Sequence, residues 1–161
     1  MTTTIQAMAR LTELSLPECL ELIGTRGVGR LAFDDEHGPI IVPVNYTFHG
    51  GVVHMRTADG SKLEAAQRRA MAAFEVDVVD VDHGDGWSVV IRGRLRRLVA
   101  PESTDYPGEP EPLADGDRHH LIGLVPQSIT GRGLTPTGNV HIPAEPEGNI
   151  WWGRDGDDLL G

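Results

Sequence analysis

The residues of this chain best suited to chemistry lie in one short stretch. A predicted strand over 52–57 ends in Arg56 and Thr57, and a predicted helix begins four positions later with Ser61 and Lys62. Two cationic and two hydroxyl side chains therefore meet where the first helical N–H groups lack partners. Arg supplies paired donors and Lys a point charge, which suits a phosphate monoester. The alternative is that Ser61 only caps the helix and Arg56 pairs with a surface carboxylate.

A second candidate segment lies within a predicted strand over 40–48. Its members are consecutive: Pro43, Val44, Asn45 and Tyr46. Because proline removes a backbone donor, this strand is expected at a sheet edge or a bulge, with exposed backbone groups. Those groups could hydrogen-bond to the rim of a flat heterocycle. The alternative is an ordinary edge strand with Tyr46 packed on the core.

A third candidate opens the long strand predicted over 87–99. Trp87 at a strand end could cover a ligand ring or belong to the core, with Ser88 beside it. No metal site is expected, because the seven histidines are scattered and the neighbours His119 and His120 would point to opposite faces of a strand. The single cysteine, Cys19, excludes an internal disulfide. We identify no side chain as a general acid or base.

Short strands joined by turns dominate the predicted elements. Strands are predicted over 28–33, 40–48, 52–57, 72–79, 87–99 and 121–129. Two S-x-x-E capping boxes predict helices, one starting at Ser15 and ending at Gly24, the other running from Ser61 to residue 71. This order is typical of a mainly β fold, a small antiparallel barrel with a few helices.

The predicted organisation has three parts: an N-terminal lead-in over 1–14, a barrel domain over 15–133, and a C-terminal tail over 134–161. Residues 1–100 carry 11 basic and 13 acidic groups, whereas residues 101–161 carry 3 and 11. The prolines and acids of 101–117 predict a surface loop. The formal charge of −10 disfavours nucleic acid and anionic membrane surfaces as partners. With no apolar run of about 20 residues and no signal-peptide pattern, we expect a cytoplasmic protein.

Taken in order, these segments resemble a known family. They are Glu18 to Leu20 in a short helix, Gly29 to Phe33, Pro43 to Tyr46, Arg56-Thr57 with Gly60 to Leu63, Phe74 to Asp77, Gly86 to Val89, and Ile129 to Arg132. The series is similar to the pyridoxamine 5′-phosphate oxidase-like flavoproteins, in particular the small bacterial members related to nitroimidazole-resistance proteins. The resemblance covers about residues 12–133. No single motif is specific, but their order and spacing together are.

The resemblance implies a six-stranded antiparallel split β-barrel that forms a homodimer with FMN at the subunit interface. It places the FMN phosphate on Arg56, Thr57, Ser61 and Lys62. It also implies that 43–46 runs along the isoalloxazine and that Trp87 and Ser88 approach the ring. The implied function is an FMN-dependent oxidoreductase that acts on a small-molecule substrate by electron or hydride transfer.

The chain departs from the true oxidase in its last predicted strand. That enzyme has an arginine–histidine pair for the vitamin's phosphate, whereas this chain has Gly131-Arg132-Gly133 and an unfamiliar tail with Trp151 and Trp152. Oxidation of pyridoxamine phosphate is therefore not expected. Two alternatives stay open: a deazaflavin-dependent reductase, and a non-catalytic flavin- or haem-binding sensor or storage protein.

Overall fold

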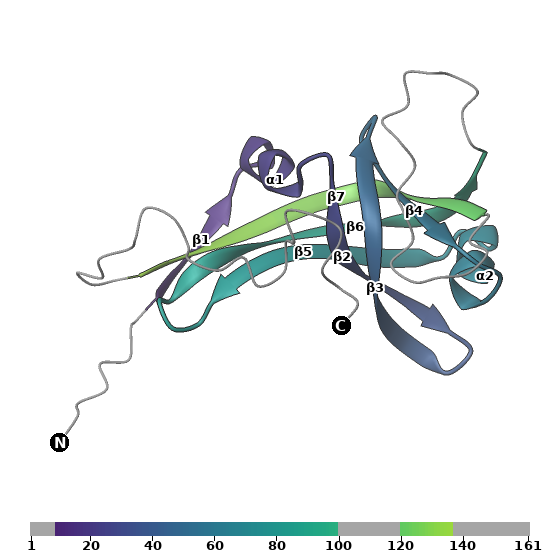
Figure 1. Ribbon diagram of the computed structural model, residues 1–161, viewed down its shortest axis with the longest axis horizontal. Helices are drawn as coiled ribbons and strands as arrows, with labels where there is room; N and C mark the ends of the chain where they lie inside the picture. Colours follow the sequence, from purple (N-terminus) through teal and green to yellow (C-terminus); the bar gives the residue numbers. More distant parts are fainter. Residues whose placement is uncertain (1–8, 100–119, 137–161) are drawn as a thin grey trace, which may run out of the picture.

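The computed structural model describes residues 9–99 and 120–136. These residues form seven strands and two helices (Figure 1). In chain order they are β1 (Ala9–Leu14), α1 (Leu16–Ile23), β2 (Arg26–Asp35), β3 (Gly38–His49), β4 (Val52–Thr57), α2 (Ser61–Gln67), β5 (Met71–Asp80), β6 (Asp85–Leu98) and β7 (His120–Pro136). Neither α1 nor α2 is long and apolar enough to cross a membrane.

Six of the strands close into a ring. The order β7-β4-β3-β2-β5-β6 is completed by pairing of β6 with β7, and every pairing is antiparallel. The 17-residue β7 makes this closure possible, because its first part pairs with β4 while nearly its whole length pairs with β6. The predicted six-stranded antiparallel barrel with a few helices is thus confirmed. β1 is a seventh strand outside the ring.

The prediction of a lead-in through residue 14 is wrong for Ala9–Leu14, which form β1 and pair with residues 131–136 of β7. Four of its six residues are exposed, so the strand lacks the alternating pattern that reveals strands in a sequence. The last part of β7 also lacks a regular alternation, so the strand ends at Pro136 and not at the predicted Ile129. The loop 101–117 and the tail residues Trp151 and Trp152 lie outside the described residues.

The two predicted capping boxes have different outcomes. At α1 the Glu18 carboxylate accepts hydrogen bonds from the backbone N–H and the hydroxyl of Ser15, and Gly24 ends the helix with φ 62°. At α2 the N-cap is Gly60, and Ser61 is the first helical residue without a capping bond from its side chain. α2 also ends at Gln67 rather than residue 71, because Arg69 takes a φ of 55° and Met71 already begins β5.

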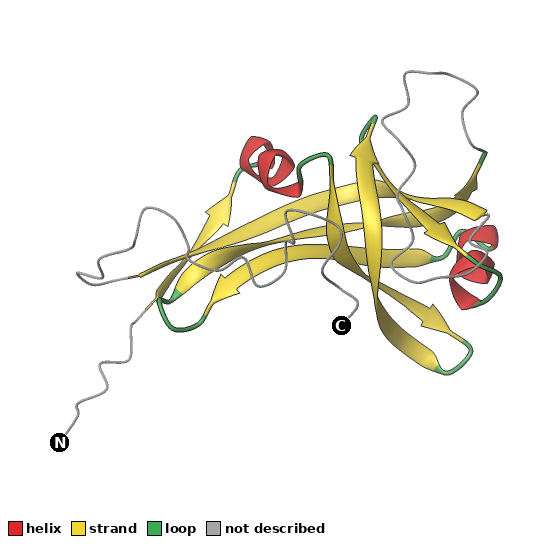
Figure 2. Cartoon of the chain, viewed as in Figure 1, coloured by secondary structure: helices red, strands yellow, loops and turns green. Residues whose placement is uncertain are grey.

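The core fills the ring and continues beneath α1. Inward residues alternate along the strands, as at Phe74 and Val76 of β5, which are 0% and 3% exposed. α1 packs closely on the sheet because Gly131 has no side chain: a Cβ there would lie 2.5 Å from the Cys19 sulfur. α1 and α2 lie toward opposite ends of the sheet (Figure 2).

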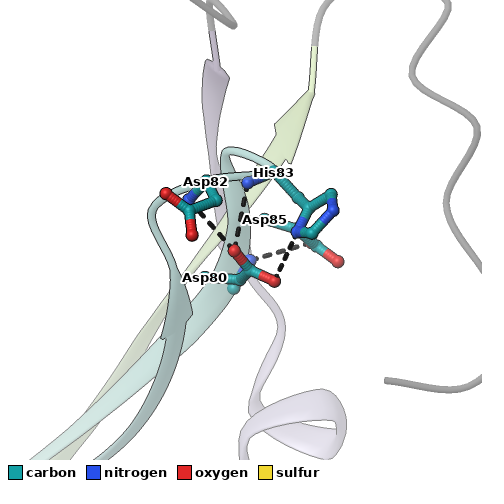
Figure 3. A network of polar contacts seen from close by, with 5 residues as sticks. Asp80, Asp82, His83 and Asp85 are labelled. Atoms are coloured by element: carbon teal, nitrogen blue, oxygen red, sulfur yellow. Dashed lines mark hydrogen bonds and ion pairs between the residues drawn. The ribbon is translucent and has the colours of Figure 1, made fainter. Parts of the chain in front are cut away.

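The turn between β5 and β6 closes the end of the sheet far from α2 (Figures 1 and 3). One oxygen of the Asp80 carboxylate accepts from the backbone N–H groups of Asp82 and His83, each at 3.0 Å. The other oxygen lies 2.7 Å from Nδ1 of His83. These contacts lower the pKa of Asp80, the backbone bond from His83 most and its side-chain bond next. Three hydrogen bonds of the turn thus end on the Asp80 carboxylate.

Candidate functional site

A hollow of about 270 Å³ lies between the end of β4 and the start of α2. It is lined by one continuous run of the chain: Thr57, Ala58, Asp59, Gly60, Ser61 and Lys62. Three of these residues, Thr57, Ser61 and Lys62, are predicted phosphate ligands. The structure therefore brings three of the four predicted groups together around a space open to small ions.

The shape of this hollow depends on Gly60. Its φ of 131° and ψ of −165° lie in a region that residues with a side chain rarely adopt, although a Cβ would meet nothing within 4 Å. The constraint is therefore conformational rather than steric. The dipeptide Asp59-Gly60 is a turn signal, and it stops β4 at Thr57 and starts α2 at Ser61. Thr57 is 3% exposed, and its hydroxyl donates to the carbonyl of Ala58 at 3.1 Å.

The fourth predicted group, Arg56, does not line the hollow. It precedes Thr57 in β4, so its side chain points to the other face of the strand. It is half-buried and lies opposite Leu121 of β7. In this chain the cation at the hollow is therefore Lys62.

The hollow has a neighbour that sequence reasoning missed. His120, the first residue of β7, lies opposite Thr57, and its Nε2 is 3.0 Å from Oδ1 of Asp59. Asp59 itself borders the hollow. The two residues are 61 positions apart, so only the pairing of β4 with β7 could have indicated this contact. In the sequence, Asp59 followed by Gly60 predicts a turn, but it does not predict a ligand site.

The segment 43–46 lies on a partly open edge of β3. Among the described residues, β3 pairs along its length with β2 but with β4 only through Thr47, Phe48 and His49. The edge position expected from Pro43 is thus confirmed. Val44 and Tyr46 point into the core at 6% and 2% exposure, and the Tyr46 hydroxyl donates to the carbonyl of Ile23. Pro43 is exposed and Asn45 half-buried, so only they and the backbone can face a ligand.

Trp87 and Ser88 are distant from the hollow within one chain. Leu98 of β6 and Arg56 of β4 both lie opposite Leu121, whereas Trp87 lies opposite Gly133. The eleven positions from Trp87 to Leu98 span roughly 35 Å of strand. Trp87 packs against the edge of the core and is half-buried, as is Ser88. One chain therefore does not bring these residues to the same ligand as Lys62.

A second hollow, of about 200 Å³, lies on the outer face of the sheet. Its lining residues come from four neighbouring strands: Arg30, Ala32, Ile41, Ala73, Glu75 and Val90. Ile41 is 67% exposed here, and Arg30 forms an ion pair with Asp77. This depression combines an exposed apolar side chain with charged residues at its margin.

Comparison with known proteins agrees with this fold. A family model described as pyridoxamine 5′-phosphate oxidase matches residues 15–132. The FAD-binding protein from Mycobacterium smegmatis is 30% identical, with 77% of this chain and 98% of that chain covered and a TM-score of 0.56. A Corynebacterium glutamicum protein with a provisional pyridoxamine 5′-phosphate oxidase name is 29% identical, with coverages of 78% and 93% and a TM-score of 0.63.

One curated relative is an uncharacterised protein of Mycobacterium tuberculosis. It is 28% identical over 132 residues, which are 78% of this chain and 87% of the relative. The family model spans the barrel from the first helix to the last strand, and it includes every residue that lines the hollow beside α2. The chain belongs to the pyridoxamine 5′-phosphate oxidase family.

Proposed function

We propose that this protein binds a flavin nucleotide, FMN in the first instance, with its phosphate in the hollow formed by residues 57–62. The observation that carries the proposal is the placement of Lys62. It is the only lysine among 14 basic residues, and it borders a hollow that also has two hydroxyl side chains. Its charge and the hydroxyls are suited to the oxygens of a phosphate. α2 has seven residues, so we attribute binding to side chains and the turn rather than to a helix dipole.

The residues present fit a phosphate in three respects. Gly60 supplies the backbone conformation that shapes the turn, which residues with a side chain rarely adopt. Thr57 and Ser61 carry hydroxyls that can donate to phosphate oxygens once Thr57 exchanges its bond to Ala58. Lys62 supplies the positive charge. When bound, the flavin would accept and release electrons or a hydride, and the chain's own residues would bind and orient it.

The open edge of β3 is the place for the flavin ring. On the side away from β2, no strand pairs with 43–46 in the described part of the sheet. Carbonyl and N–H groups there can form hydrogen bonds with the heteroatoms on the rim of an isoalloxazine. Pro43 and Asn45 point outward beside it. Tyr46 and Val44 would contribute through their backbone, because their side chains are in the core.

We further propose that two copies of the chain complete each site. Trp87 and Ser88 of one copy lie about 35 Å of strand away from its own hollow, so they would approach the flavin of the partner. The outer apolar face around Ile41 offers a surface for that second copy. The expected activity is oxidoreduction of a small molecule in the cytoplasm. No side chain is assigned as a catalytic acid or base.

The test is the visible spectrum of the purified protein, followed by titration with FMN, FAD, riboflavin, a deazaflavin and haem. FMN binding in a ratio of one per chain supports the proposal. FAD is included because the relative from Mycobacterium smegmatis is an FAD-binding protein. Tighter binding of a deazaflavin or of haem would favour the corresponding alternative function. A protein that binds none of the flavins would contradict the proposal.

Replacement of Lys62 tests the phosphate site directly. Lys62→Ala removes a charged donor, and we expect FMN affinity to fall by about 1–3 kcal/mol. Riboflavin has no phosphate, so its affinity should not change. Lys62→Arg keeps the charge and should retain part of the affinity. The control is Arg10→Ala, which removes a positive charge from exposed β1 at the other end of the sheet. Equal FMN affinity in Lys62→Ala and the parent would exclude Lys62 from the site.

A further inference from the structure

The pair formed by Asp59 and His120 places a carboxylate beside the proposed phosphate site. Nε2 of His120 lies 3.0 Å from Oδ1 of Asp59. A carboxylate can only accept, so Nε2 carries the proton and donates it in this bond. The Asp59 side chain is 93% exposed, whereas that of His120 is 24% exposed. The histidine is therefore the enclosed member of the pair and the aspartate the exposed one.

His120 is fixed by the sheet. It begins β7, and its Cα lies opposite that of Thr57, the last residue of β4. The next positions, Leu121 and Ile122, are 4% and 0% exposed and hold the strand in place. The imidazole is thus presented at the strand ends, directly beside the turn that contains Asp59. A barrel strand that begins 61 residues later supplies a partner for this turn.

Without that partner, Asp59 would act against phosphate binding. It is one of the six residues that border the hollow, and it is the acidic one among them. A freely rotating carboxylate there would repel a phosphate dianion a few ångströms away. It would also compete for the ammonium of Lys62, which lies three positions later on the same rim. The hydrogen bond to Nε2 of His120 gives this carboxylate a partner at the start of β7.

We propose that His120 is a positioning residue for phosphate binding, which holds the Asp59 carboxylate away from the phosphate. This inference rests on the proposed function and adds to it the residue that makes an acidic turn compatible with an anionic ligand. His120 is not among the residues that line the hollow. Its effect is exerted through Asp59 alone, so replacing His120 should lower FMN affinity only while the Asp59 carboxylate is present.

The test is a set of variants titrated with FMN and with riboflavin. His120→Ala releases the carboxylate, and we expect about a tenfold loss of FMN affinity with riboflavin unchanged. His120→Gln keeps a donor and should recover part of the loss. The double variant His120→Ala with Asp59→Asn has no carboxylate to release and should bind FMN as Asp59→Asn does. The loss in His120→Ala should shrink at high salt, because it is a charge repulsion.

The matched control is His83→Ala, which removes the same kind of contact, a histidine on Asp80, at the turn far from α2. It should leave the ratio of FMN to riboflavin affinity unchanged. The inference is overturned if His120→Ala binds FMN like the parent, if it loses FMN and riboflavin equally, or if Asp59→Asn fails to rescue it. Failure of the proposed function is seen separately, in the parent protein, as absence of binding to any flavin; the inference then falls with it.

Discussion

At the scale of single residues, Tyr46 shows how a predicted ligand residue can serve the fold instead. Its ring is 2% exposed and packs edge-on against Phe74 with centroids 5.0 Å apart. Its hydroxyl donates to the carbonyl of Ile23, the last residue of α1. This contact ties α1 to the barrel. The side chain of Tyr46 is therefore expected to matter for stability and not for flavin binding.

Tyr46→Phe tests this division of roles. The change keeps the ring but leaves the buried carbonyl of Ile23 without its donor, so we expect a loss of about 1–2 kcal/mol in the free energy of unfolding. Urea denaturation measures this loss, and FMN titration should give the affinity of the parent. Lys62→Ala is the reciprocal control, with affinity lowered and stability kept. A Tyr46→Phe protein with parental stability would show that the bond contributes nothing.

The same hydroxyl also predicts a dependence on alkaline pH. Burial raises the pKa of Tyr46 to about 12, from 10.0 for an exposed phenol. The fold therefore favours the protonated form, and its contribution is complete below pH 10 and declines as the pH rises through 12. Tyr46→Phe has no proton to lose. The stability difference between parent and variant should therefore shrink in that window, as measured by urea denaturation at a series of pH values.

At the scale of elements, the sequence predicted those whose signals are local. The capping box at Ser15 forms because the residue before the helix is the serine itself. The same pattern at Ser61 does not form, because Gly60 takes the N-cap and shifts the serine into the helix. β1 was missed since its partner begins at residue 131 and most of its side chains are exposed. Strand pairing across that distance leaves no local pattern.

The candidate site divides in the same way. Thr57, Ser61 and Lys62 could be predicted together because they are neighbours in the sequence around a glycine turn. His120 could not, because only the register between β4 and β7 brings it to Asp59. The outer apolar face was likewise not predicted. Its residues come from four different strands, and in the sequence each of them alone looks like an ordinary outward-facing side chain of a strand.

The β5–β6 turn offers a prediction for a single element. Asp80 accepts two backbone N–H groups and faces His83, so its pKa lies below the usual 3.8. A lowered pKa means that the charged carboxylate stabilises the fold above pH 3.8 and that this contribution is lost as the pH falls through the lower, folded value. Asp80→Asn should thus lower the midpoint of urea unfolding at pH 7.

The difference between Asp80→Asn and the parent should vanish once both are measured below the folded pKa of Asp80. Asp82→Asn is the matched control, because Asp82 contributes its backbone N–H and not its carboxylate. It should leave the midpoint unchanged at both pH values. A loss in Asp80→Asn that persists undiminished in acid would show that the carboxylate's charge is not what orders the turn.

At the scale of the whole molecule, the position of the predicted ligand residues indicates how many chains one site needs. Lys62 belongs to α2, whereas Trp87 lies near the start of β6, opposite Gly133 in the part of β7 that pairs with β1. The helices α1 and α2 lie toward opposite ends of the sheet (Figure 1). The strand β6 runs between these ends without interruption apart from one bulge at Arg92 and Gly93. If both groups act on one flavin, we infer that they come from different copies of the chain, and we propose the outer sheet face as the surface that joins the two copies.

Ile41→Asp tests this arrangement. The change places a charge in the apolar hollow of the outer face, where the side chain is 67% exposed, so it should not unfold the monomer but should oppose burial against a second copy. We expect a dimeric parent and a monomeric variant in analytical ultracentrifugation, with unchanged thermal stability at low protein concentration. Flavin affinity should fall when the dimer is lost, although residue 41 lies outside the phosphate hollow.

Leu16→Asp is the control, because it adds the same charge at an exposed leucine of α1, which covers the opposite face of the sheet. This variant should remain dimeric. A monomeric parent that binds FMN with full affinity would mean that one chain suffices, and Trp87 would then have no part in the site.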